Sequence, residues 1–112
     1  MCRTLTTLGA LGPSRRLSRC TCGAYHVVWA HLHLSLHPDE FAELCRLFAS
    51  PLPAGERRDV GLWHLHLQEG AAGLWYGPMC VSLPADDVRE LRALLLGVQV
   101  QSVAPRPLYA LN

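Results

Sequence analysis

The chain repeats itself at a fixed offset of 47 residues. Residues 27–48 align with residues 74–95 without a gap, and six of the 22 aligned pairs are identical. The identical pairs are Ser35/Ser82, Leu36/Leu83, Asp39/Asp86, Glu43/Glu90, Leu44/Leu91 and Leu47/Leu94. A match at a fixed period indicates that one supersecondary unit occurs twice, and such units bury their apolar faces against each other. The repeat therefore constrains the fold strongly, although it does not by itself predict a function.

Each unit contains several short apolar runs with the period of a strand. Residues 25–29 are aromatic and β-branched, and residues 31–36 place leucines on one face and polar residues on the other. Residues 62–68 alternate in the same way, and residues 74–76 lead into residues 79–83. Period-two alternation is typical of half-buried antiparallel strands. We expect a further strand at Arg16–Cys20.

A helix follows the strands of each unit. Residues 38–48 and 84–96 both begin with proline, which suits the first helical turn, and both carry two acids there, which favour the positive end of the helix dipole. Apolar residues then recur at three-to-four spacing and form one buried stripe. We expect Gly97 to end the second helix and residues 98–103 to add an edge strand.

These elements predict an α+β fold built from a tandem pseudo-two-fold β-β-α repeat, with units at about residues 15–50 and 62–97. We expect one antiparallel sheet with two helices on one face, forming a single α+β domain over residues 15–104. Residues 54–59 then form a polar connector between the units. Residues 1–14 are expected to form a flexible leader, and residues 105–112 a tail.

The composition limits the class of protein. A chain of 112 residues suits one domain. Its ten basic residues are all arginine, a bias typical of a GC-rich genome, so they do not indicate nucleic-acid binding. No apolar run approaches the roughly 18 residues that a membrane span needs. Five irregularly spaced cysteines argue against a secreted disulfide framework and favour a cytoplasmic protein.

Four histidines form the sharpest candidate for a metal site. His31 and His33 point the same way from one predicted strand, as do His64 and His66 from another. If the two strands were neighbours, four imidazoles would gather, and imidazole binds zinc and other transition metals. The simpler interpretation is that they are the polar half of amphipathic strands. The aligned positions in the other unit are not histidines, which favours this simpler interpretation.

Cysteines provide a second candidate. Cys20 and Cys22 lie close to His26, and Cys80 lies on the polar face of its predicted strand. These four residues could hold zinc, but the C-x-C spacing differs from the C-x-x-C turn that wraps the ion. The alternative is that they are unrelated reduced thiols. Cys45 is expected to fill the core, and no catalytic arrangement of nucleophile, base and acid is visible.

Aromatic residues suggest an interaction surface. Trp75 and Tyr76 are adjacent in a predicted strand, so their side chains point to opposite faces and one of them must meet solvent or a partner. With His31 and His33 expected on the same sheet, this face is a candidate surface for self-association. Ordinary aromatics at the edge of the core are the alternative.

The stretch C-x-C-G-x-x-H, an apolar strand, an alternating strand and then P-D-E-F-x-E-L, over residues 20–48, resembles a group of small uncharacterised bacterial proteins. The resemblance implies strands followed by a helix and brings no activity. The exposed aromatic and histidine-bearing face, together with the absence of a catalytic arrangement, predicts a small soluble, non-enzymatic domain. We expect it to act through protein contacts as a homodimer or with a protein partner, without cofactors, nucleic acid or a membrane. The alternative is a protein that binds zinc or another transition metal.

Overall fold

The computed structural model describes residues 4–30 and 32–103, which form two antiparallel four-stranded sheets and two helices. The first sheet contains β1 (Leu5–Ala10), β2 (Arg15–Cys20), β3 (Tyr25–Trp29) and β4 (Leu32–Leu36), and α1 (Pro38–Leu47) follows. The second contains β5 (Arg57–Val60), β6 (Trp63–Gln68), β7 (Ala71–Tyr76) and β8 (Met79–Pro84), and α2 (Ala85–Val103) follows. Each sheet has its strands in sequence order. The predicted α+β class is confirmed.

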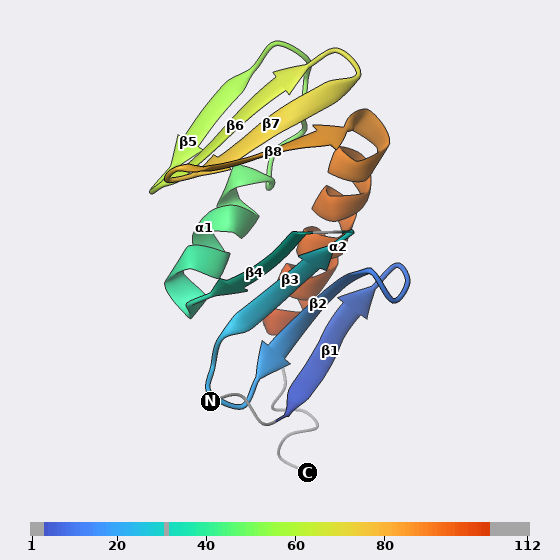
Figure 1. The fold of residues 1–112 in the computed structure, drawn as a ribbon, viewed down its shortest axis with the longest axis vertical. Coiled ribbons are helices and arrows are strands. Elements are labelled where there is room, and N and C mark those ends of the chain that lie inside the picture. Colours follow the sequence, from blue (N-terminus) through green and yellow to red (C-terminus); the bar gives the residue numbers. More distant parts are fainter. Residues whose placement is uncertain (1–3, 31, 104–112) are drawn as a thin grey trace.

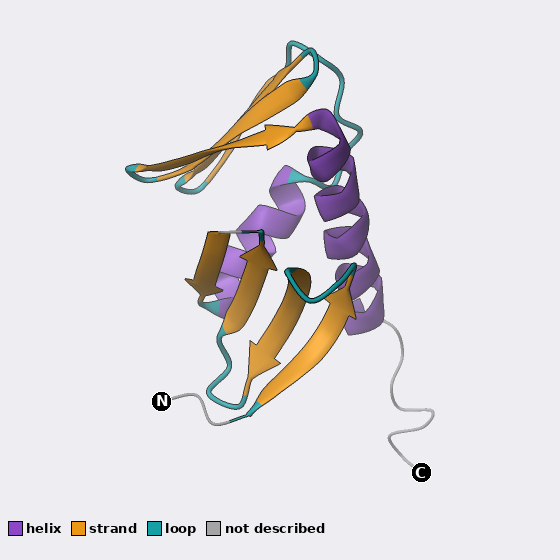
Figure 2. Ribbon diagram, turned by 45° about the vertical axis from the view of Figure 1, so that its right-hand side comes forward, coloured by secondary structure: helices purple, strands orange, loops and turns teal. Residues whose placement is uncertain are grey.

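Both helices contact both sheets. α1 follows β4 but also packs on β5 and β6, and α2 follows β8 and contacts β7 but also reaches β1 and β2. Figure 1 shows the two sheets at opposite ends of the helices, and Figure 2 shows that the helices lie on one side of each sheet. The core therefore forms where the inner faces of both sheets meet the helices.

The core consists of the apolar residues that the alternating strands and helical stripes supply. Its side chains come from both sheets and both helices: Leu17, Val27, Trp29 and Leu36 from the first sheet, Trp63, Leu65, Leu67 and Leu74 from the second, and Phe41, Leu44, Leu47, Leu91 and Leu95 from the helices. Removing apolar surface from water stabilises the fold by about 25 cal/mol per Å². The other face of each sheet carries the histidines of its strands, His26 and His33 in the first sheet and His64 and His66 in the second.

The expectation of one continuous sheet is wrong. β4 and β8 each end a separate sheet, because the chain leaves each of them directly into a helix. After α1, the connector of residues 48–56 leads to β5, and β5 pairs with β6 rather than with β4. α1 thus separates the two sheets in sequence, and both helices contact both sheets in space.

Three boundaries also differ from the expectation. The expected leader contains β1, which pairs with β2, and the expected polar connector contains most of β5. α2 continues through Gly97 to Val103 in place of the expected edge strand, and Val98 in these additional turns is buried. The reason is tertiary: a Cβ at Gly9 of β1 would lie 2.9 Å from Leu94, so α2 packs closely on β1. The expected tail, residues 105–112, lies outside the described residues.

The order β-β-β-β-α occurs twice, and the alignment at an offset of 47 carries β3, β4 and α1 onto β7, β8 and the first part of α2. The turn after β3 and the turn after β7 each begin with a residue of left-handed φ. Ala30 has a φ of 56° and Gly77, at the aligned position, has a φ of 57°. This left-handed conformation suits glycine and is strained for alanine. We call residues 5–47 the first unit and residues 57–103 the second unit.

Polar contacts tie the helix of each unit to the sheet of the other. The indole nitrogen of Trp29 donates to the carboxylate of Asp87 in the first turn of α2, at 3.3 Å. The hydroxyl of Tyr76 donates to the carboxylate of Glu40 in the first turn of α1. Both pairs occupy aligned positions of the repeat, since Trp29 aligns with Tyr76 and Glu40 with Asp87.

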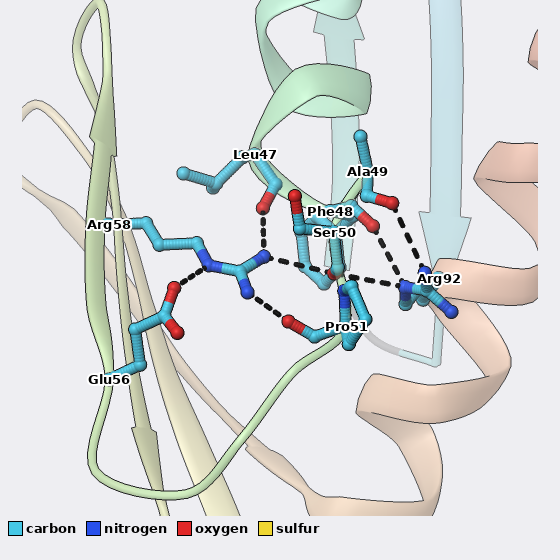
Figure 3. A network of polar contacts seen from close by, with 8 residues as sticks. All are labelled: Leu47, Phe48, Ala49, Ser50, Pro51, Glu56, Arg58 and Arg92. Carbon is cyan, nitrogen blue, oxygen red and sulfur yellow. Dashed lines mark hydrogen bonds and ion pairs between the residues drawn. The ribbon is translucent and has the colours of Figure 1, made fainter.

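Two arginines of the second unit hold the end of α1 (Figure 3). Arg58 of β5 donates to the carbonyl oxygens of Leu47 and Ser50, each at 3.1 Å, and also pairs with Glu56. Arg92 of α2 donates to the carbonyls that follow Leu47 along the connector. The last carbonyls of a helix lack partners within the helix, so these guanidinium groups satisfy them.

Candidate functional site

The outer face of the second sheet carries the clearest group of functional side chains. It is the face opposite the core, and strand pairing places His64 beside Trp75 and Trp75 beside Cys80. We define the outer face by its residues Arg57, Asp59, His64, His66, Gly73, Trp75 and Cys80. Both helices contact this sheet from its inner side, where Trp63 and Leu65 are buried.

Trp75 lies flat on this outer face. A Cβ at Gly73, two residues earlier on the same side of β7, would lie 2.6 Å from the six-membered ring of Trp75. The absence of a side chain at Gly73 therefore allows the indole to lie across the strand. His64 packs edge-on against the same ring, with centroids 5.2 Å apart and an interplanar angle of 61°. The result is an aromatic platform that is half-buried by its own strand and open on its other side.

Asp59 fixes the orientation of His64. Its carboxylate is within hydrogen-bonding distance of Nδ1 of His64, and the side chains of His64 and Asp59 are 34% and 74% exposed. Strand β7 lies between His64 and Cys80, so the two residues are separated by two strand spacings, about 10 Å. That separation exceeds hydrogen-bonding reach, and His64 therefore does not activate the thiol of Cys80.

A second polar pair lies on the first sheet. Nδ1 of His26 on β3 and Nε2 of His33 on β4 are 3.1 Å apart. The strand register explains the contact, because His26 pairs with Ser35 and His33 with Val28, which makes the two histidines diagonal neighbours on one face. Two nitrogens bound to one tetrahedral zinc ion at about 2.0–2.1 Å would be about 3.3 Å apart, so the pair has the separation of two ligands.

The structure does not bring the predicted histidine set together. His33 lies on the first sheet, whereas His64 and His66 lie on the second, so the two strands are not neighbours as that prediction required. His31 lies outside the described residues. The histidine that does meet His33 is His26, which the sequence placed with the cysteines instead.

The predicted cysteine set is also divided between the sheets. Cys20 is buried at the end of β2, Cys22 is exposed in the turn that follows, and His26 is on the adjacent strand β3. Cys80 is on β8 of the second sheet. Within residues 4–30 and 32–103, no three His, Cys, Asp or Glu side chains form a group that could hold a metal ion.

The core cysteine and the two predicted interface aromatics have separate environments. Cys45 is buried, and loss of hydration raises the pKa of its thiol to about 11, which keeps it protonated. Trp75 is on the outer face of the second sheet, and Tyr76 points inward to Glu40. The expectation that His33 shares a sheet with Trp75 is wrong, because β4 and β7 belong to different sheets.

A cleft of about 340 Å³ lies where the two sheets approach each other. The turn after β3 and the edge strand β8 line it, together with the carboxylate of Asp87. That carboxylate is already bound by the indole of Trp29 and by Arg15, 3.2 Å away. The other lining residues are mostly apolar, so the cleft offers little polar recognition to a ligand.

The sequence did not single out Asp59 or Gly73, which complete the outer face, because Asp59 lay in the expected connector and Gly73 lay outside the expected strands. Had residues 57–60 been predicted as a strand paired with β6, Asp59 would have been expected opposite His64.

Across the described part of the chain, no helix has both the length and the apolar character needed to cross a bilayer. No protein-family model matches the chain, and no curated protein or solved structure is significantly similar to it.

Proposed function

We propose that the protein works as a small interaction domain, without catalysis, and that the outer face of the second sheet binds a second copy of the chain. The single observation that carries the proposal is the placement of Trp75 across Gly73 on the open side of that sheet. Tryptophan is enriched among the residues that dominate interface energies, because it buries a large area while losing little rotamer freedom.

The charges of this face suit contact between two identical copies. A two-fold interface is self-complementary, so ion pairs across it require both signs of charge on one surface. Arg57 and Asp59 lie on the same edge strand and the same face, separated by one residue. Arg57 of one copy can therefore meet Asp59 of the other while the two Trp75 platforms stack between them. The cysteine usage supports a reducing, cytoplasmic setting for this proposal.

Light scattering coupled to size exclusion tests the proposal with the full chain. The parent is expected to be a dimer at tens of micromolar, and Trp75→Ser is expected to weaken association at least about tenfold. Leu62→Ser is the matched control, because Leu62 is an exposed apolar residue in a turn, 66% exposed, away from the outer face. A monomeric parent, or a Trp75→Ser variant that dimerises like the parent, would contradict the proposal.

A second candidate function is transition-metal binding through His26 and His33, which the 3.1 Å separation of their nitrogens favours. Calorimetric titration of untagged protein with zinc, nickel and copper tests it. We expect binding to the parent that His33→Gln weakens at least about tenfold, with His66→Gln as the control on the other sheet. Equal binding by all three proteins, or no thermal stabilisation of the parent by any of the metals, would remove this candidate.

The proposal also includes a pseudo-two-fold relation between the two units. The aligned Trp29–Asp87 and Tyr76–Glu40 pairs support it, as does the matching turn backbone at Ala30 and Gly77. Internal symmetry of this kind is typical of a fold whose two halves complete each other.

A further inference from the structure

Hydrogen bonds and ion pairs join the side chains of the first unit to those of the second unit. In α1, the carboxylate and the main-chain oxygen of Glu40 accept hydrogen bonds from Tyr76 and from the indole of Trp63, the latter at 3.0 Å. In α2, Asp87 accepts from Trp29, and Glu90 accepts from Arg15 at 2.6 Å. Each helix thus finds polar partners in the other unit.

One short segment connects the two units along the chain. Arg58 fixes the carbonyls of Ser50 and Pro51, and backbone hydrogen bonds join Gly55 and Glu56 to β6. Residues 52–54 are the part of the connector that lies between these two groups of hydrogen bonds, and we call them the hinge. Pro53 biases its preceding residue toward an extended backbone, which is the conformation that a straightened hinge would require.

From these contacts we infer that two copies of the chain exchange units, so that the first unit of each copy packs on the second unit of the other. The exchanged dimer keeps every contact between units and changes only the hinge at residues 52–54. Exchange of identical elements is a low-cost route to dimers, because it needs no new surface. This inference shares self-association with the proposed function, but it uses the interface between units rather than the outer face.

A pair of full-length charge variants tests the exchange. Arg15→Glu places a carboxylate against Glu90, and Glu90→Arg places a guanidinium against Arg15, so each variant opposes like charges within its own chain. In an exchanged heterodimer, the two substituted positions meet each other at one interface, and the native Arg15 meets the native Glu90 at the other. Both interfaces therefore regain opposite charges. One variant is tagged, and the two are mixed in moderate urea, diluted and analysed by native mass spectrometry.

We expect dimers that contain one copy of each variant to exceed about half of all dimers, the share that random pairing gives without a difference in affinity. Arg19→Glu is the matched control, since Arg19 is exposed on the same strand as Arg15 and lies outside the outer face, and its mixture with Glu90→Arg should not be enriched. The double variant Arg15→Glu/Glu90→Arg restores opposite charges between positions 15 and 90 within one chain but leaves a carboxylate at position 15 beside Asp87, so its urea midpoint should lie between those of the single variants and that of the parent.

The outcomes separate the two modes of association. Enrichment that persists when Trp75→Ser is added to both variants supports exchange and shows that the exchanged dimer does not depend on the outer face. If dimers form without an excess of mixed pairs, and Trp75→Ser abolishes them, exchange is overturned and the proposed function stands. A chain that stays monomeric after mixing and dilution overturns both.

Discussion

The hydroxyl of Tyr76 donates a hydrogen bond to the carboxylate of Glu40, a residue 36 positions earlier in the chain. The bond joins the end of β7 to the first turn of α1. Two hydrogen bonds hold the pKa of Glu40 below its usual range. The larger effect comes from the hydroxyl of Tyr76 and the smaller from the main-chain N–H of His37. The same bond raises the pKa of Tyr76 to about 12, because the phenol would lose its role as donor on ionisation.

Removing this hydroxyl should change the pH dependence of stability. The carboxyl of Glu40 has a lowered pKa in the folded state, so its contribution is present above the unfolded pKa of about 4.3 and is lost as the pH falls through the folded value. Urea unfolding at pH 6 and pH 3 should therefore show a smaller acid loss for Tyr76→Phe than for the parent. Tyr25→Phe is the control and should keep the parent's acid loss. Equal loss in all three proteins would show that the bond does not stabilise the fold.

The aligned turns at Ala30 and Gly77 predict opposite effects of opposite substitutions. Both residues have a φ near 57°, which costs an L residue about 1–2 kcal/mol. Ala30→Gly should raise the free energy of unfolding by about 1 kcal/mol, after allowing for the greater freedom of glycine in the unfolded chain, and Gly77→Ala should lower it by about 1 kcal/mol. Urea midpoints of the two variants measure the effect. Changes of the same sign would show that the two turns are not equivalent.

Arg58 should stabilise the fold far more than an exposed arginine does. Its side chain is only 13% exposed and donates to carbonyls at the end of α1. Arg58→Ala should cost about 2–3 kcal/mol, because hydrogen bonds from a charged donor to partly buried oxygens are lost. Arg89→Ala, which removes only an exposed pair with Asp86, should cost less than about 0.5 kcal/mol. Similar unfolding free energies for the two variants would show that the hydrogen bonds of Arg58 in Figure 3 do not stabilise the fold.

Gly97 tests the length of α2. It lies within the helix, and a Cβ at this position would meet nothing within 4 Å outside the helix's own local backbone. Gly97→Ala should therefore raise the free energy of unfolding by about 1 kcal/mol, the difference in helix propensity between the two residues. A destabilised variant in urea unfolding would instead indicate that the helix ends near Gly97, as the sequence alone suggested.

The sequence predicted the elements whose signals are local. The alternation of residues 32–36 and 63–68 depends only on successive side chains, and both form strands. The start of α1 follows from a proline and two acids at its first positions. β1 and β5 were missed because LTTLGA lacks a clear alternation and RRDV is short and charged. Such segments become strands because a neighbouring strand pairs with them.

The candidate sites were predicted only in part. The sequence identified Trp75 and Tyr76 as residues that face opposite ways, which follows from the geometry of a strand. It grouped His33 with histidines of the second sheet, although the hairpin register places it beside His26. A turn directly after Trp29 would have given that register, because each hairpin turn fixes which residues face each other.

The sequence by itself determined the local order of this protein: two segments that align at an offset of 47 residues, strands with one apolar face, and a helix after each group of strands. The tertiary structure decided that these strands form two sheets and that each helix finds polar partners in the other unit. The physical reason is that alternation identifies the face of a strand that must be buried but not the partner that buries it. That partner is selected by long-range packing, which only the folded chain defines.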